Sequence, residues 1–388
     1  MQVDRLELED FRNYERQSAA FAPGINLIVG RNAQGKTNLL EAVYLLGGLG
    51  SPRSADADLV RQGCDRAVVH AEVARGSRRV RVDIELRPGR GARALLNGSP
   101  ISGTRALKEL VTTVFFGPDE LSLIKGSPDG RRRFVDEVAM KLRPARDAVR
   151  REWERVLRQR NALLKSAPLR GSAGTSARAT LEVWDEAFAR VGAELAAARF
   201  HVLGRLAPYA AKRYVGIAGG GDLHLRYASG WLEADVSDAW IAEPDTVDVE
   251  LARTTLERRI DEVREREIER GMSLVGPQRD DVDILLTSAS GTPTPMDARL
   301  FASQGDQRTC ALALKLGEHD LVTDALGEQP ILLLDDVFSE LDPARRSWLA
   351  DAVRSIGQTF ISSAEPGAIE AVGEGRVIEV DGGVLRVG

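Results

Sequence analysis

An eight-residue stretch near the N-terminus constrains the fold of this chain more than any other feature. Residues 30–37 read Gly-Arg-Asn-Ala-Gln-Gly-Lys-Thr and fit the pattern Gly-x-x-x-x-Gly-Lys-Ser/Thr. The apolar residues 25–29 precede them, and apolar residues recur after them at helical spacing. Strand, glycine loop and helix in this order form a P-loop, in which amides at a helix N-terminus surround phosphate oxygens. The stretch therefore predicts a nucleoside-triphosphate site.

Each position of this loop has an expected role. Lys36 is expected to reach the β- and γ-phosphates as a catalytic residue, and Thr37 to ligate Mg²⁺. The alternative is a chance match in a glycine-rich chain, and the flanking strand and helix argue against it. The residues expected to hold the nucleotide are Gly30, Arg31, Asn32, Ala33, Gln34, Gly35, Lys36, Thr37 and Asn38.

Length and composition allow several lobes and exclude some classes of protein. The chain has 388 residues, enough for two or three lobes with their own cores. No apolar run approaches the ~20 residues of a membrane span, and the N-terminus is acidic, so we expect a cytoplasmic protein with no membrane partner. The net charge of −5 argues against general coating of nucleic acid but permits a local basic face. Cys64 and Cys310 show no metal-ligand spacing, so we assign them no chemistry.

The segments after the loop predict an antiparallel sheet and then a helical lobe. Leu6 and Leu8 alternate with charged residues and predict an opening edge strand, and residues 80–86 alternate strictly between apolar and charged side chains. Asn97 and Gly98 are typical of a tight hairpin turn. From about residue 144 the apolar spacing becomes helical, with a Gly/Ser-rich connection expected at 166–176. Residues 251–270 predict a charged helix with a solvated face, ended by Gly271.

A second motif lies near the C-terminus. The apolar residues 331–334 lead directly into Asp335 and Asp336. Such a run predicts a buried parallel strand whose end directs acids at a metal ion, which is a Walker B pattern. We expect Asp335 to hold Mg²⁺, directly or through water, and Asp336 to polarise the attacking water. Alone the pattern also fits an ordinary strand end, but with the P-loop it indicates a catalytic site.

Five blocks, in this order along the chain, resemble the RecF family of bacterial recombination mediators within the ABC-type ATPase superfamily. Residues 303–305 precede a predicted helix and the Walker B strand, and residues 339–342 follow that strand. ABC-type ATPases have their signature, Walker B and D-loop in this order. Asp306 stands where the family usually has Gln, and Gln278 where His is usual. The five blocks are residues 11–14, 35–42, 276–281, 303–308 and 334–342.

The resemblance implies an α/β fold related to SMC-like head domains. This fold is an ABC-type P-loop ATPase head with a mixed sheet, in which a parallel core joins an antiparallel subdomain, and with an inserted helical lobe. We expect residues 1–143 to form the N-terminal part of the head, residues 144–271 the helical lobe, and residues 272–388 the C-terminal part of the head.

The resemblance also implies a function. ATP and Mg²⁺ would close a homodimer, with each nucleotide between one copy's P-loop and the signature residues Ser303, Gln304 and Gly305 of the other. The closed dimer would grip double-stranded DNA near single-strand gaps and act with RecR and RecO to load RecA. Slow, DNA-stimulated ATP hydrolysis would open it, as a conformational switch. A carboxylate at Asp306 would be unfavourable near the γ-phosphate unless it points away.

The residues that contact DNA or nucleotide outside these motifs stay open. Arg131, Arg132 and Arg133 follow a predicted helix start, where cations oppose the helix dipole, so an anionic partner is one interpretation. A solvated arginine cluster is the other. Arg12 and Asn13 fit either a nucleotide contact or an ordinary loop role.

Three other classes of P-loop protein compete with this interpretation. An ABC transporter subunit usually carries less helical material, and has a switch histidine where Ser362 and Ser363 follow a strand here. A long-coiled-coil chromosome-maintenance ATPase would need sustained heptads, which are absent from the sequence. A P-loop kinase would need neither signature nor D-loop.

Overall fold

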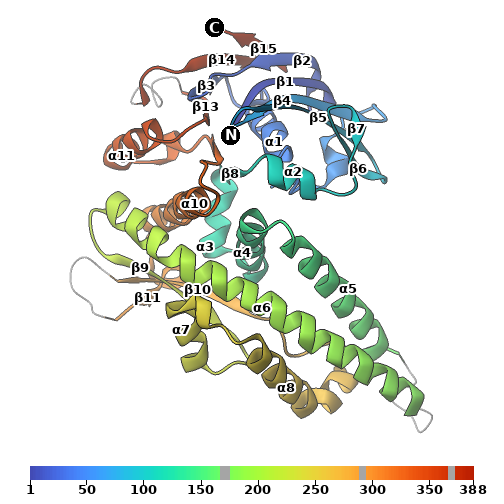
Figure 1. Ribbon diagram of the computed structural model, residues 1–388. Coiled ribbons are helices and arrows are strands. Elements are labelled where there is room, and N and C mark those ends of the chain that lie inside the picture. The colour runs from blue at the N-terminus through green and yellow to red at the C-terminus, as the bar shows by residue number, and fades with distance from the viewer. Residues whose placement is uncertain (167–174, 288–293, 366–371) are drawn as a thin grey trace. The chain divides into compact units, whose positions relative to one another are not determined.

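The computed structural model describes residues 1–166, 175–287, 294–365 and 372–388 (Figure 1). The chain forms two compact units. Unit 1 comprises Met1–Glu120, Arg213–Gly219 and Ala311–Gly388, and unit 2 comprises Leu121–Lys212 and Gly220–Cys310. These bounds do not coincide with the expected segments 1–143, 144–271 and 272–388, because α6 (Thr175–Ala218) and α10 (Gln304–Leu326) each contribute residues to both units.

A mostly parallel six-stranded sheet lies in unit 1, in the order β15-β14-β3-β13-β12-β8. Its β12 is buried along its whole length, as the apolar run predicted. Strands β3 and β12 both pair in parallel with β13, so their carboxyl ends meet at one edge of the sheet. That edge therefore brings the P-loop to the Walker B acids. The strands are β3 (Ile25–Val29), β8 (Thr113–Phe116), β12 (Ile331–Asp335), β13 (Thr359–Ser363), β14 (Arg376–Asp381) and β15 (Val384–Val387).

An antiparallel six-stranded sheet, in the order β2-β1-β4-β5-β6-β7, completes the sheet structure of unit 1. Strand β1 lies between β2 and β4, so the expected edge position is wrong, because β1 pairs on both sides. The predicted hairpin turn is confirmed, with φ of 48° at Asn97 and 80° at Gly98. The strands are β1 (Gln2–Phe11), β2 (Tyr14–Ala20), β4 (Ala67–Arg75), β5 (Arg78–Arg87), β6 (Gly91–Leu96) and β7 (Ser99–Pro100).

One hydrophobic core in unit 1 joins both sheets to the helix after the P-loop. It contains Leu8 of β1, Leu40 of α1 (Lys36–Leu45) and Phe360 of β13, all fully or almost fully buried. The P-loop helix is thus fixed on its apolar side. The remaining short elements of unit 1 include η1 (Asp56–Leu59), α2 (Arg105–Leu110), η5 (Phe338–Glu340) and α11 (Pro343–Arg354).

Unit 2 contains the predicted long helices and a three-stranded sheet, in the order β11-β10-β9, whose strand β9 the sequence analysis did not anticipate. The charged helix α8 begins after Asp248, whose carboxylate accepts two backbone N–H groups, and ends at Gly271 with φ 66°. Strand β9 (Asp222–Ala228) lies inside the expected helical lobe and pairs with β10 (Asp281–Thr287), which follows that lobe. The other elements are α3 (Ser122–Lys125), α4 (Pro128–Leu142), α5 (Arg146–Leu164), α7 (Ala234–Ala242), η4 (Pro244–Thr246), α8 (Val249–Arg270), β11 (Met296–Asp297) and α9 (Ala298–Phe301).

Most of the connection predicted at 166–176 lies outside the described residues. The solvated face predicted for α8 holds only in part, because Glu267 is fully buried in an ion pair. Among the helices of the described residues, none combines the length and the apolar character needed to cross a membrane.

Candidate nucleotide-binding site

Both glycines of the P-loop are required, for different reasons. Gly35 caps α1 with φ 122°, a conformation that side chains rarely adopt. A Cβ there would also lie 2.7 Å from Asn13 and 2.9 Å from the hydroxyl of Tyr14. Gly30 has ordinary φ, but a Cβ would overlap the backbone carbonyl of Val380 in β14. The loop can therefore keep its shape only with glycine at both positions.

Residues at the β1–β2 turn support the loop. The Tyr14 hydroxyl donates to the carbonyl oxygen of Gly35 at 2.8 Å, and Asn13 Nδ2 donates to that of Gln34 at 2.7 Å. Asn13 Oδ1 also accepts from Asn38 Nδ2 at 2.8 Å. Asn13, a candidate nucleotide contact in the sequence, is thus a residue that shapes the loop.

Arg12 anchors the helix that follows the loop. Its guanidinium donates to both carboxylate oxygens of Glu41 in α1, at 2.9 and 3.0 Å. Glu41 is fully buried, and a buried carboxylate is costly unless it is paired in this way. Arg12 Nη1 also donates to the carbonyl oxygen of Asp58 at 2.9 Å. These bonds occupy the Arg12 side chain and give it a positioning role.

Lys36 folds back over the loop that it follows. Its Nζ donates to the carbonyl oxygens of Gly30 at 2.8 Å and Arg31 at 3.0 Å. Burial lowers the pKa of Lys36, and the carboxylates of Asp336 and Asp335 oppose that shift. Neutral carbonyl groups hold this cation, so its charge is not cancelled by a paired acid within hydrogen-bond distance. The loop crest beyond it is exposed, at Arg31, Asn32 and Ala33.

The structure brings Thr37 and Asp335 together. Thr37 Oγ1 donates to the Asp335 carboxylate, with its oxygens at 2.8 and 3.0 Å. Ser362 in β13 donates to Asp335 Oδ1 at 2.6 Å. Burial raises the pKa of Asp335, and the hydrogen bonds from Ser362 and Thr37 oppose the shift. The sequence analysis did not identify Ser362 as a partner, although the parallel register places it directly opposite Asp335.

Asp336 follows with a backbone that turns sharply away from the strand. Its φ of 53° is left-handed, which aspartate tolerates better than most residues. The Asp336 N–H donates to the carbonyl oxygen of Ser362 at 3.2 Å, and Ser339 Oγ donates to Asp336 Oδ1 at 3.1 Å. A locally strained acid held at the end of a sheet is typical of a functional position.

These side chains suit Mg²⁺ that binds together with a phosphate. Mg²⁺ prefers oxygen ligands and commonly uses one or two carboxylates with substrate phosphates and water. Thr37 and Asp335 supply a hydroxyl and a carboxylate 2.8 Å apart. No group of three or more His, Cys, Asp and Glu side chains that could hold a metal occurs among the described residues. The donor set therefore fits an ion that arrives with nucleotide.

The signature residues lie in unit 2, at the start of α10. Ser303 and Gln304 are exposed and Gly305 is half-buried. Ser303 Oγ donates to Asp306 Oδ2 at 2.8 Å and accepts from the Asp306 N–H at 3.2 Å. This reciprocal pair resembles a capping box. Asp306 therefore points toward Ser303 and accepts its hydroxyl proton in a hydrogen bond.

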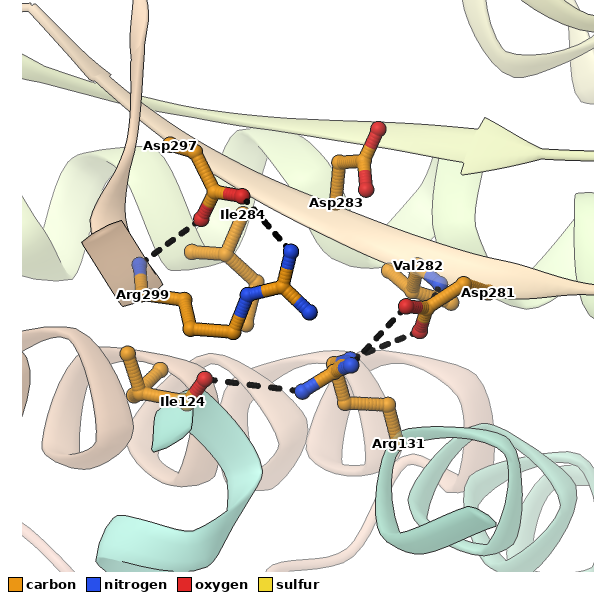
Figure 2. A pocket seen from close by; sticks show the side chains of 8 residues that line it. All are labelled: Ile124, Arg131, Asp281, Val282, Asp283, Ile284, Asp297 and Arg299. Atoms are coloured by element: carbon orange, nitrogen blue, oxygen red, sulfur yellow. Dashed lines mark hydrogen bonds and ion pairs between the residues drawn. The ribbon is translucent and has the colours of Figure 1, made fainter. Parts of the chain in front are cut away.

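The three-arginine surface considered from the sequence is not present. Arg131 is buried and pairs with both oxygens of Asp281, at 2.7 and 2.8 Å (Figure 2). Arg132 is only 12% exposed and donates to the carbonyl oxygen of Asp280. Only Arg133 of the three is exposed. The structure argues against a DNA-binding cluster, because Asp281 of β10 pairs with Arg131 and Asp129 of α4 pairs with Arg132.

The block at residues 276–281 has a structural role in unit 2. Asp280 accepts from the Tyr227 hydroxyl at 2.7 Å and from Trp231 Nε1 at 3.0 Å, and burial raises its pKa to about 6. The buried Arg199 donates to the carbonyl oxygen of Pro277 at 2.7 Å. At the unusual position, Gln278 Nε2 donates to the carbonyl oxygen of Val275 at 2.8 Å.

Fold and site together define an ABC-type P-loop ATPase head. The sequence matches the family described as "RecF/RecN/SMC N terminal domain" over residues 2–382. The DNA replication and repair protein RecF of Beutenbergia cavernae is 44% identical over 403 residues, with 100% of both chains covered. This chain belongs to the RecF family, which confirms the resemblance seen in the sequence.

Solved structures agree with this assignment. The structure of the recombination mediator protein RecF-ATPrS in the RecFOR pathway is 28% identical with a TM-score of 0.86, covering 100% of this chain and 98% of that one. The RecF-ATP structure from the same pathway also has a TM-score of 0.86 at 28% identity, covering 99% and 97%. An SMC head bound to the C-winged helix domain of ScpA has a TM-score of 0.56 at 16% identity, covering 100% and 97%, and shares the fold. The predicted ATPase-head fold is confirmed.

Proposed function

We propose that this chain is an ATP-dependent DNA-binding protein of recombinational repair, in which ATP and Mg²⁺ close a homodimer on duplex DNA near single-strand gaps. One observation carries the proposal: Lys36, Thr37 and Asp335 converge at one edge of the parallel sheet, where carbonyl oxygens hold Lys36 and hydroxyl groups, one of them from Thr37, hold Asp335. Family membership supports it, since the relatives are named DNA replication and repair proteins. It favours this function over that of a transporter subunit.

The chain's own residues would bind the nucleotide as follows. Backbone amides of residues 30–38 surround the phosphates at the N-terminus of α1. Lys36 Nζ turns from the carbonyl oxygens of Gly30 and Arg31 to the phosphate oxygens, a small movement because the cation already lies over the loop. Thr37 and Asp335 would hold Mg²⁺, which would supply positive charge to the terminal phosphoryl group.

Asp336 is the proposed base for hydrolysis. Ser339 Oγ lies 2.7 Å from the Asp336 carbonyl oxygen and 3.1 Å from its Oδ1, so its single proton can go to either, and Oδ2 would orient the attacking water and accept its proton. Its left-handed backbone directs it away from the strand that carries Asp335. We propose that hydrolysis is slow and DNA-stimulated, and that it serves as a switch.

The signature residues would act on the other copy's nucleotide. Ser303, Gln304 and Gly305 begin a 23-residue helix segment, so backbone N–H groups and the helix dipole face an anion placed there. Loss of the γ-phosphate removes interactions that exist only in the closed dimer, and the dimer opens. RecR and RecO are the proposed partners, with RecA as the protein finally loaded, in keeping with the RecFOR pathway named for the similar structures.

Fluorescence anisotropy of gapped duplex DNA tests the proposal. The full chain is titrated with Mg-ATP or Mg-ADP, and Lys36→Met serves as the variant. We expect binding with ATP that falls at least tenfold with ADP and in Lys36→Met. Equal binding in every state would overturn the ATP-gated clamp.

The trans arrangement has its own test. Ser303→Arg should bind nucleotide like the wild type and fail to form ATP-dependent dimers in sedimentation velocity, because an arginine obstructs the facing site. Ser99→Arg, at an exposed position of β7, is the matched control and should dimerise normally. Undiminished dimers in Ser303→Arg would reject the arrangement.

A further inference from the structure

A cluster of cations in unit 2 belongs to no motif of the sequence. Arg143 ends α4, and Arg146 begins α5 with its N–H donating to the Arg143 carbonyl oxygen at 2.9 Å. His201 and Arg205 lie one turn apart on α6, so they share a face of that helix. The charges of Arg143 and Arg205 act on Arg146, and all three arginines act on His201. Three elements thus place four basic side chains together.

Arg146 differs from the buried arginines of unit 2 because no carboxylate of the described residues pairs with it. In the described part of the chain, no hydrogen bond or ion pair engages the half-buried guanidinium of Arg146. Three buried arginines of unit 2 are paired with carboxylates: Arg131, Arg160 and Arg199. An unpaired, partly desolvated cation beside like charges destabilises the folded chain unless a ligand supplies the opposite charge.

Two acids and one helix end lie near the cluster. Asp147, in the first turn of α5, pairs with Arg150 at 3.1 Å. Asp245 in η4 pairs with Arg205 at 2.9 Å and is the single acid whose charge acts on His201. Burial, followed by repulsion from Arg143 and Arg205, lowers the pKa of Arg146 to about 10, so it stays charged at neutral pH. At the N-terminus of α5, Ala145 offers no capping side chain, and Asp147 in the first turn offsets part of the positive field of the helix dipole.

We propose that Arg143, Arg146, His201 and Arg205 form a phosphate-binding patch that contacts the backbone of duplex DNA. The proposal rests on the proposed function and deepens it by locating the contact. Planar guanidinium groups bind phosphate oxygens in pairs, which makes arginine better suited to this ligand than a single point charge. Arg143 and Arg205 are exposed enough to reach a backbone, and Arg146 lies half-buried beside them. The net positive cluster excludes a basic partner and favours a polyanion.

Salt-dependent DNA binding tests the patch. The double variant Arg143→Gln/Arg205→Gln removes two exposed charges without touching the core, and Arg146→Gln removes the half-buried one. Anisotropy of a duplex oligonucleotide with Mg-ATP is measured over a series of salt concentrations. We expect the double variant to bind about tenfold or more weakly and its log–log salt slope to fall by about 2, since each arginine neutralises one phosphate. Arg146→Gln should lower the slope by about 1.

The control is Arg258→Gln, an exposed position on α8 in the same unit, which should match the wild type in affinity and slope. If the wild type fails to bind duplex DNA with Mg-ATP, the proposed function fails. If the wild type binds and the double variant keeps its affinity and slope, the patch is overturned and an acidic protein segment becomes the candidate ligand. Thermal unfolding of each variant verifies that it is folded.

Discussion

The nucleotide edge of unit 1 and the buried arginines of unit 2 hold charge in opposite ways. In unit 1, carbonyl oxygens hold Lys36, and hydroxyl groups hold Asp335. In unit 2, buried arginines meet carboxylates, as Arg131 meets Asp281. A charge held by dipoles keeps most of its field for a ligand, whereas an ion pair cancels it. A buried cation held by neutral groups can therefore serve a ligand, whereas a buried cation paired with a carboxylate serves the fold.

Arg160 is the most completely buried of the paired arginines Arg131, Arg160 and Arg199. It is fully buried, and its guanidinium donates to Asp185 at 2.7 Å, to Glu267 at 2.6 Å and to the Ser273 hydroxyl at 2.7 Å. The pairs join α5, α6 and α8 within unit 2. Nothing of this cation faces solvent.

The largest expected effect is that of Arg160→Met. Removing the cation leaves Asp185 and Glu267 buried without it, which should lower the free energy of unfolding by about 3–5 kcal/mol. Urea unfolding followed by circular dichroism measures this. The exposed pair of Arg178 with Glu265 is the control, and Arg178→Met should cost at most about 1 kcal/mol. Similar losses of unfolding free energy in both variants would contradict the distinction between buried and solvent-exposed ion pairs.

Asp280 should make the stability of the protein depend on pH. It is a buried carboxylate of unit 2 that accepts hydrogen bonds from neutral Tyr227 and Trp231. Burial raises its pKa from 3.8 to about 6, so between these values the folded chain holds a proton that the unfolded chain has released. This contribution is fully present below pH 3.8 and is lost as pH rises through about 6. The loss should be on the order of 3 kcal/mol.

Asp280→Asn tests this assignment. Urea unfolding from pH 4 to pH 7 should show a flatter profile in Asp280→Asn than in the wild type, because the titrating group is gone. Asp283→Asn, in the more exposed pair with Arg226, is the matched control and should keep the wild-type fall. An unchanged slope in Asp280→Asn would assign the titration to another group.

Thr37→Val tests the proposed metal site of unit 1. The variant keeps the shape of the side chain but loses the hydroxyl that meets Asp335. We expect ATP affinity in the presence of Mg²⁺ to fall by about 10- to 100-fold, with little change in EDTA. Titration of a fluorescent ATP analogue in both conditions measures this. An equal loss with and without Mg²⁺ would remove Thr37 from the metal site.

The smallest effect is expected at Asp306. Asp306→Ala removes the charge and releases the Ser303 hydroxyl, whereas Asp306→Asn removes only the charge and can still accept from Ser303. We expect Asp306→Ala to tighten ATPγS-dependent dimerisation by about three- to tenfold, the value of one hydrogen bond, and Asp306→Asn by less. Sedimentation velocity measures both. Weaker dimers in the two variants would show that the carboxylate supports the interface.

Patterns carried by neighbouring residues predicted much of this protein. The P-loop, the buried Walker B strand and the capped helix α8 all follow from residues contiguous in the chain. Strand β9 was missed, although buried Leu223, Leu225 and Tyr227 alternate with polar residues in the manner of a strand. A signal was therefore present there, inside a segment dominated by helical spacing.

Other features depended on tertiary structure. Asp281, which buries Arg131, lies 150 residues away in the chain, and Ser362 meets Asp335 only through the register of two parallel strands. The residue types at the phosphate loop and at the strand ends can be predicted from the sequence alone, because those patterns are local. Which charges are cancelled and which stay available depends on the tertiary structure, because ion pairs form between elements that are distant in the chain.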